Sequence, residues 1–290
     1  MNLKSLRYFS TVAELSSFTR AAEILGVAQS AVSLSIKKLE DNLGLQLFDR
    51  QDRTIRLTDE GKRLLHHAAL IQQAVADAER EMDDLKGLER GSVRVGIPGM
   101  MGSYFFPPIL MAFRHRYPQL NLSVIEGGTG ELQQMLENKE LDLSVIVEDF
   151  APPELETRHI LRTQMMVTVS KEHPLANHTE ISYDTFFEQD LVMFKEGYFH
   201  RMVIDQLACE NNATPRIVFE TNLTPLIKQI VKQEFAVSTL LGMAVEDDSE
   251  LVTIPFKKPI WLNLCIAWRR SGYLSRANQA FVDFLLDQKR

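Results

Sequence analysis

The chain has 290 residues, 45% of them hydrophobic and 24% charged, and its formal net charge is −7. These values indicate a globular protein of about two domains and exclude disordered, collagen-like and small disulfide-stapled chains. No apolar run reaches the ~20 residues that a membrane span needs, and the N-terminus has no signal-peptide pattern. We therefore expect a soluble cytoplasmic protein without membrane contact.

The charge is unevenly distributed along the chain. Residues 1–63 contain ten basic and eight acidic residues, whereas the remainder has a net charge of −9. Only the first segment could favour an anionic polymer, and an excess of two positive charges does not identify one by itself.

Residues 6–47 are predicted to form three short helices, because apolar residues recur there at helical spacing in blocks broken at Ser16 and at Gly26. Ala21 and Ala22 are small enough for a second helix to cross closely, and Gly26 permits a left-handed turn. The pattern predicts a helix-turn-helix, with Ser30 as the cap of its second helix.

The second helix of this motif has a polar outer side formed by Gln29, Ser33, Lys37 and Lys38. Such side chains can reach base edges in a major groove, and lysines one turn later can meet phosphates. The alternative is an antiparallel helical pair with a solvated face. The following segment, 48–53, contains Arg50 and Arg53 before an alternating strand over 53–58, which predicts a basic wing beside the helices.

A long helix is predicted from about residue 59 to 88. Its apolar residues are separated by alternating steps of four and three, a period of 3.5 that favours pairing with a second helix over about 45 Å. We predict a dimerisation helix, with a core helix of a single domain as the alternative. The seam consists of Leu64, Ala68, Ile71, Val75, Ala78, Met82 and Leu85.

Beyond Gly91 strands alternate with helices, which predicts two α/β lobes. The strands are expected at 93–97, 120–125, 141–147, 165–170, 191–194, 217–220, 236–239 and 261–268, and the helices at 104–117, 129–139, 201–211 and 226–232. A terminal helix with Phe281 and Phe284 on one face is expected to return to the first lobe.

Residues 1–63 resemble the winged helix-turn-helix of LysR-type transcriptional regulators. The matching stretches are 6–9, 17–22, 29–33, 36–40, 43–44, 47–50 and 57–61. The resemblance implies that Gln29, Ser30, Ser33 and Lys37 face DNA, with Arg20, Arg50 and Arg53 on the backbone or in the minor groove. One departure is Leu34-Ser35, where many members have a long polar or basic residue after the serine.

The resemblance covers the whole chain and implies a DNA-binding domain at 1–58, a linker helix at 59–90 and an effector-binding domain at 91–290, similar in fold to periplasmic solute-binding proteins. Lobe I would comprise about 91–161 and 267–290, and lobe II about 162–266. The expected partners are double-stranded DNA with an interrupted palindrome, RNA polymerase, and further copies of the chain in a dimer and a tetramer. No cofactor is expected beyond a small-molecule effector.

In this family the effector lies between the lobes. Segments 98–103 and 127–130 join strands to helices, so their free N–H groups could hold a carboxylate or another polar group, with Thr129 as a helix cap or a ligand contact. Ordinary turn glycines are the alternative. The candidate effector residues are Gly99, Met100, Ser103, Thr129, Lys195, Asn222 and Thr224. Gly99 and Met100 replace a serine of relatives that sense aromatic acids, and 234–237 replaces a glycine-rich segment.

Two other classes of function compete with a regulator. Residues 35–38 match the S-x-x-K pattern of some serine hydrolases, but the partner motifs are absent, so we expect no enzyme. A solute-binding transport protein would suit two lobes but not the N-terminal domain. The distant Cys209 and Cys265 are expected to be buried and without a redox role, and the adjacent His66 and His67 do not suggest a metal site.

Overall fold

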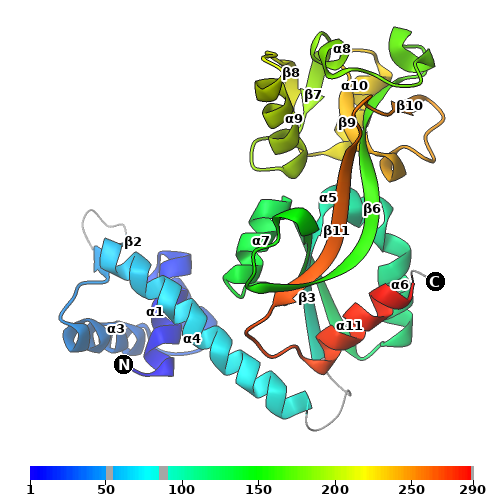
Figure 1. The fold of residues 1–290 in the computed structure, drawn as a ribbon. Helices are drawn as coiled ribbons and strands as arrows, with labels where there is room; N and C mark the ends of the chain where they lie inside the picture. Colours follow the sequence, from blue (N-terminus) through cyan, green and yellow to red (C-terminus); the bar gives the residue numbers. More distant parts are fainter. Residues whose placement is uncertain (50–54, 85–90, 289–290) are drawn as a thin grey trace. The chain divides into compact units, whose positions relative to one another are not determined.

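The computed structural model describes residues 1–49, 55–84 and 91–288, and the chain forms two compact units, 1–83 and 84–290 (Figure 1). Each unit has its own buried core. Within the described residues, no helix has the length and apolar character needed to cross a membrane.

The first unit is a three-helix domain with a short hairpin and a long helix. Its elements are α1 (Leu3–Leu15), α2 (Phe18–Leu25), α3 (Gln29–Leu43), β1 (Phe48–Asp49), β2 (Arg56–Leu57) and α4 (Asp59–Asp84). Ser17 caps α2 by accepting a hydrogen bond from Arg20 N, and Gly26 ends it at a φ of 66°. The left-handed turn that the sequence predicts at Gly26 is therefore present.

The helices enclose one apolar core. Val32, Ile36 and Leu39 bury the inner side of α3, and the Phe48 ring lies 5.3 Å from Phe9 and 5.8 Å from Phe18. Phe48 thereby fixes the start of the hairpin against the helices, because its burial removes a large apolar surface from water.

The prediction of Ser30 as the N-cap residue of α3 is wrong, because the helix begins two residues earlier than that prediction requires. Ala28 is the N-cap residue, with an extended backbone and no side-chain cap, and α3 begins at Gln29. Ser30 lies inside the first turn and is exposed. The Gly26–Val27 turn is short enough for Ala28 to be the last extended residue, so the helix begins before Ser30.

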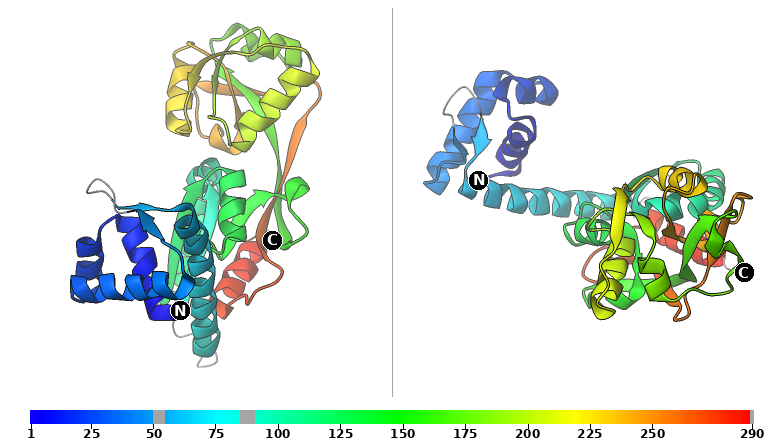
Figure 2. Two further views of the ribbon diagram at one scale, coloured as in Figure 1. Left: turned by 90° about the vertical axis from the view of Figure 1, so that its left-hand side faces the viewer. Right: turned by 90° about the horizontal axis from the view of Figure 1, so that it is seen from above.

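The long helix α4 is one continuous element of 26 residues (Figure 2). Its first half packs on the domain it follows: Ala68 is fully buried, Leu64 and Ile71 contact the core, and Gln72 donates a hydrogen bond to Ser10 Oγ. Further along the predicted seam, Ala78 and Met82 are exposed. Leu85 lies outside the described residues.

The second unit contains two lobes. In chain order its elements are β3 (Gly91–Pro98), α5 (Gly99–Tyr104), α6 (Phe106–Arg116), β4 (Leu120–Gly127), α7 (Thr129–Glu137), β5 (Leu143–Val147), η2 (Glu148–Phe150), β6 (Leu155–Ser170), η3 (Pro174–Asn177), α8 (Tyr183–Phe187), β7 (Asp190–Met193), α9 (Phe199–Glu210), β8 (Arg216–Glu220), α10 (Thr224–Lys232), β9 (Ser238–Leu241), η4 (Gly242–Ala244), β10 (Leu251–Ile254), β11 (Ile260–Arg269) and α11 (Arg276–Asp287).

The main sheet has the order β10-β6-β11-β5-β3-β4, with β9 also paired to β6, and β7 and β8 form a small parallel pair. β3 is parallel to β4 and to β5, as the alternation of strands and helices predicts. α7 covers one face of the first lobe, and α6 and α11 cover the other (Figure 1). Phe281 and Phe284 of α11 contact Phe113 of α6, so the terminal helix returns to the first lobe as expected.

Two strands pass from one lobe into the other. β6 has 16 residues and runs antiparallel to β11, with an irregular register at Leu264 and Cys265 (Figure 1). The sequence predicts only the second half of β6, over 165–170. The first half pairs with residues 264–269 of β11, so tertiary pairing extends a strand whose own pattern is weak.

The predicted helix over 104–117 is present as α6, and one expectation about the cysteines is wrong. The sequence pattern misses the short helix α5 before it, which stays separate from α6 because Pro107 and Pro108 lack the N–H groups that would continue one helix into the next. Cys209 is exposed on the solvent side of α9, next to the buried Ala208, whereas Cys265 is buried in β11 as expected.

Candidate nucleic-acid interface and effector site

The N-terminal half of α3 presents polar side chains on its outer side. Gln29 and Ser30 are exposed, and Gln29 Nε2 donates a hydrogen bond to Ser33 Oγ at 3.0 Å. Lys37 is exposed one turn later, on the side away from the buried Val32 and Ile36. These groups supply donors, acceptors and one positive charge on one continuous surface, which suits a helix that reads a DNA groove.

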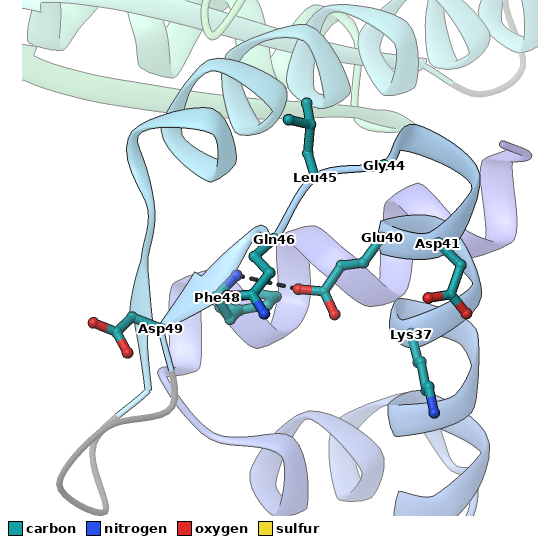
Figure 3. A pocket seen from close by; sticks show the side chains of 8 residues that line it. All are labelled: Lys37, Glu40, Asp41, Gly44, Leu45, Gln46, Phe48 and Asp49. Carbon is teal, nitrogen blue, oxygen red and sulfur yellow. Dashed lines mark hydrogen bonds between the residues drawn. The ribbon is translucent and has the colours of Figure 1, made fainter.

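The C-terminal half of α3 carries both charges, with Lys37 and Lys38 beside Glu40 and Asp41. It borders an open hollow of about 800 Å³ that Lys37, Glu40, Asp41 and Asp49 line, and Figure 3 shows the Glu40 side chain pointing toward the hairpin. Glu40 Oε1 accepts hydrogen bonds from the backbone N–H groups of Leu47, at 2.9 Å, and Phe48, at 3.3 Å. Glu40 thus attaches the hairpin to α3.

The predicted wing is present as the hairpin of β1 and β2, in which Phe48 pairs with Leu57 and Asp49 with Arg56. Arg50 and Arg53 lie outside the described residues. Arg20 is exposed near the start of α2. Arg56 is also exposed, and the sequence pattern misses it as a candidate although it alternates with the partly buried Ile55 and Leu57.

The cavity between the two lobes is narrow, about 50 Å³, and mostly apolar. It is lined by Pro98, Gly99, Met100, Met101, Glu126, Gly127, Gly128, Thr129, Val147, Phe194, Tyr198, Phe199, His200, Asn222, Leu241, Leu262 and Leu264. Four of the predicted effector residues, Gly99, Met100, Thr129 and Asn222, meet here. A cavity of this size holds a few small atoms or requires the lobes to separate for a larger ligand.

The other three predicted effector residues are not part of this lining. Ser103 and Thr224 line a neighbouring hollow of about 310 Å³, to which Gly99, Glu126 and Asn222 also contribute. Lys195 is exposed, and its backbone N–H donates a hydrogen bond to Asn222 Oδ1 at 3.0 Å. Lys195 therefore fixes the position of Asn222 through its backbone, and its side chain is not part of either lining.

The two strand-to-helix turns differ from the expected carboxylate cradle. Thr129 does not cap α7: the N-cap residue is Gly128, without a side-chain hydrogen bond. At the other turn, Glu126 Oε1 lies so close to Gly99 that a Cβ on residue 99 would collide with it. The carboxylate of Glu126 thus lies beside Gly99, at the turn whose free N–H groups the sequence offers to a ligand.

Contacts across the cavity hold the lobes together. The Phe150 ring lies 5.5 Å from the Phe199 ring, and the Lys228 ammonium lies 5.2 Å from the Tyr104 ring. Gly128 approaches the backbone of residue 197 so closely that a Cβ at 128 would lie 3.1 Å from the carbonyl oxygen. Aromatic side chains and the backbone at Gly128 therefore make the contacts between the two lobes at the edge of the cavity.

Two polar residues of the lining have perturbed ionisation. Burial lowers the pKa of His200 to about 4, so its imidazole is neutral at pH 7. Burial also raises the pKa of Tyr198, and the carboxylates of Glu126 and Glu131 raise it further, against a hydrogen bond with Asn222. Carboxylates of the first lobe therefore act on the Tyr198 hydroxyl of the second.

The sequence pattern misses the aromatic part of this lining. Phe194, Tyr198, Phe199 and His200 follow the end of β7 in one segment, and the Phe194 and His200 rings are 5.0 Å apart. The sequence feature that could have identified them is their position directly after a buried strand, because such residues commonly line a site in an open α/β sheet.

Each of the two units matches a known protein family model. Residues 3–62 match the model of the bacterial regulatory helix-turn-helix protein, lysR family, and residues 86–290 match the LysR substrate binding domain. The RuBisCO operon transcriptional regulator of Allochromatium vinosum is 30% identical over 292 residues, covering 99% of this chain and 96% of the relative.

Solved structures extend the likeness to the full length. Full-length OxyR from Pseudomonas aeruginosa is 26% identical, with a TM-score of 0.75, and the match covers 98% of this chain and 94% of that one. Full-length CbnR complexed with its target DNA is similar in fold, at 19% identity and a TM-score of 0.72 over 99% of both chains. These matches favour neither a solute-binding protein nor a serine hydrolase.

Proposed function

Because the chain belongs to the family of LysR-type transcriptional regulators, we propose that the outer surface of α3 reads a specific operator and that a small molecule between the lobes controls the outcome. The chain is a DNA-binding regulator with an effector-binding domain, and its relatives are transcriptional regulators rather than enzymes. Action on chromosomal DNA would place it in the bacterial cytoplasm.

The continuous polar surface of Gln29, Ser33 and Lys37 carries the proposal for the DNA side. Gln29 and Ser30, at the start of the helix, supply hydrogen-bonding groups for base edges, and Lys37 supplies a phosphate contact. Arg20 lies at the start of α2, where it would meet the DNA backbone. Arg50 and Arg53 of the wing complete the proposed interface.

The proposed assembly is a dimer through α4. Ala78 and Met82 are exposed apolar positions on the seam, and two such helices pairing would cover them. Two copies related by a two-fold axis would read an interrupted palindrome. Effector domains would join two dimers into a tetramer that contacts RNA polymerase.

The effector would act by selecting one arrangement of the lobes. A molecule that binds one arrangement more tightly than the other shifts the population toward it, and no bond needs to be made or broken. The narrow cavity supports this view, because a ligand larger than a few atoms would favour lobes that stand further apart.

The test is DNA binding by the full chain. Genomic fragments that co-purify with the protein supply the operator, and its affinity is then measured at several salt concentrations. Lys37→Ala is expected to lower the slope of log affinity against log salt by about 1, and Ser33→Ala to weaken binding of the operator more than of unrelated DNA.

Lys257→Ala is the matched control, because it removes an exposed positive charge from the second unit. Unchanged operator binding in both α3 variants, or an equal loss in the control, would contradict the proposed interface.

A further inference from the structure

The hollow of about 310 Å³ beside the narrow cavity has walls from both lobes. β3, α5 and β4 of the first lobe and the turn that leads into α10 of the second lobe line it. Gly99, Glu126 and Asn222 line both the hollow and the cavity, so the two spaces adjoin. The hollow reaches the lower end of the usual range for ligand sites, roughly 300–1,000 Å³, so it can hold a small organic molecule that the cavity of about 50 Å³ cannot.

The Glu126 carboxylate lies on the side of the sheet that the hollow occupies. Glu126 of β4 is the register partner of Ile97 of β3, and Val124 is two residues earlier on β4, so these three side chains share one face of the sheet. All three line the hollow. Glu126 Oε1 also lies against Gly99, where the hollow meets the cavity.

This carboxylate is the only charge that the two linings supply. None of the described residues that line either space is a lysine, an arginine or a second carboxylate. Within the described part of the chain, no side chain forms an ion pair with Glu126. Glu126 is therefore available to a positive group that enters the hollow, and a charge-assisted hydrogen bond to it would be a strong one.

The basic residues nearest in sequence to the second-lobe wall are engaged elsewhere. Arg201 is held by Asp205 and Glu220, and the Lys228 ammonium lies 3.0 Å from Asp248 Oδ2. An anion in the hollow would meet the charge of Glu126 and no counter-charge, whereas a cation would gain a partner.

The remaining walls are aliphatic or carry hydroxyl groups. The apolar side chains are Ile97, Val124, Leu223 and Pro225, and the hydroxyl groups belong to Ser103 and Thr224. Among the described residues that line the hollow there is no aromatic ring, in contrast to the cavity. These walls suit a short aliphatic chain, and hydroxyl oxygens can accept further hydrogen bonds from an ammonium group.

We propose that the effector is a small aliphatic ammonium compound that binds in this hollow, with its positive group on the Glu126 carboxylate and its chain between Val124 of the first lobe and Leu223 of the second. Because the walls come from both lobes, occupancy depends on how the lobes are arranged, as effector control requires. The inference rests on the proposed effector control and specifies the ligand class.

The experiment uses three probes of one shape on the full chain: butylammonium, 1-butanol and butyrate. Binding is measured by ligand-observed NMR titration into the millimolar range at constant ionic strength, with displacement between probes to show that they share a site. Butylammonium is expected to bind at least several-fold more tightly than either other probe. Butanol or butyrate binding as tightly as butylammonium, or no binding of butylammonium, would overturn the proposal.

Glu126→Gln tests the charged contact. It is expected to weaken butylammonium by about tenfold and to leave 1-butanol unchanged, because the amide has nearly the same shape and no charge. Glu131→Gln is the matched control, since Glu131 is an exposed carboxylate near the same turn that lines neither space. An equal loss in both variants, or none in Glu126→Gln, would show that no direct contact exists.

Ser103→Leu tests the location. Ser103 is exposed and lines the hollow but not the cavity, so a leucine there would fill part of the hollow alone. Butylammonium and 1-butanol are both expected to bind several-fold more weakly. Unchanged affinity would place the bound probe outside the hollow and contradict the assignment.

Operator binding is measured on the same samples. Protein that binds its operator without preferring butylammonium contradicts the ligand class alone, whereas protein without specific DNA binding contradicts the proposed function itself.

Discussion

The sulfur of Met100 accepts a hydrogen bond from the backbone N–H of Leu241 at 3.3 Å, which joins α5 of the first lobe to β9 of the second. Both residues also line the cavity between the lobes. A ligand in the cavity would therefore lie beside the two residues whose hydrogen bond joins the lobes. This gives ligand binding a direct route to the arrangement of the lobes.

Met100→Leu should loosen this connection. Leucine has nearly the same volume but no acceptor, so the Leu241 N–H loses its partner. Hydrogen exchange of peptides that contain Leu241 is expected to accelerate several-fold. Met101→Leu is the control, since Met101 is equally buried and has no such bond among the described contacts; equal acceleration in both variants would refute the connection.

Leu34 should contribute to base preference. It is 53% exposed on α3, one turn after Ser30, and an exposed apolar side chain there can contact a thymine methyl group. Leu34→Ala is expected to weaken operator binding several-fold without changing its salt dependence, measured by fluorescence anisotropy. A change in the salt slope, or an equal loss on unrelated DNA, would show that Leu34 does not read sequence.

A charge on the exposed part of the α4 seam should break the proposed dimer. Ala78→Glu is expected to convert dimers to monomers in sedimentation velocity, because two carboxylates would be buried at the interface. Ala69→Glu serves as the control: Ala69 is exposed and its helical position is opposite the seam. Dimers that persist in Ala78→Glu would exclude this seam.

His200 should make stability depend on pH. Its pKa is about 4 in the folded protein against 6.5 ordinarily, so the unfolded chain takes up a proton first as the pH falls. The stability associated with neutral His200 is complete above pH 6.5 and is lost progressively down to pH 4, by roughly 3 kcal/mol in total.

The measurement is urea unfolding of the protein and of His200→Phe between pH 7 and pH 4. The difference between their unfolding free energies should shrink or reverse toward low pH, since phenylalanine takes up no proton. A difference that stays constant over this range would show that His200 is not buried in its neutral form.

The two cysteines should differ sharply in reactivity. Burial raises the pKa of Cys265 to about 12, and its thiol donates to the Ile146 carbonyl, whereas Cys209 is exposed. One thiol per chain is expected to react with iodoacetamide in the native protein and two after unfolding, counted by mass spectrometry. Rapid native labelling of Cys265 would contradict its burial.

The fold of the first unit was largely predictable because its signals are local. The turn at Gly26, the break at Ser16 and the outer polar side of α3 depend on neighbours within one or two turns. The exception, the cap of α3, depends on the backbone of Ala28, which no side-chain pattern reveals.

The second unit was less predictable because its decisive contacts are distant in sequence. The first half of β6 exists through its pairing with β11, about a hundred residues later, and His200 reaches the cavity only when the two lobes meet. In the sequence, Glu126 is an ordinary polar residue at the end of a predicted strand. Its approach to Gly99 depends on the pairing of β3 with β4 and is not visible in the sequence.

The passage of β6 and β11 through both lobes constrains how this regulator could acquire new specificity. A second lobe taken from a related gene would have to be joined at two points in the middle of strands. An error of one residue at either junction would turn every later side chain of that strand to the opposite face. An exchange of lobes between related genes would therefore keep the fold only if both junctions preserve the register of the strands. Gradual substitution of residues around the cavity is the easier route to recognition of a new effector.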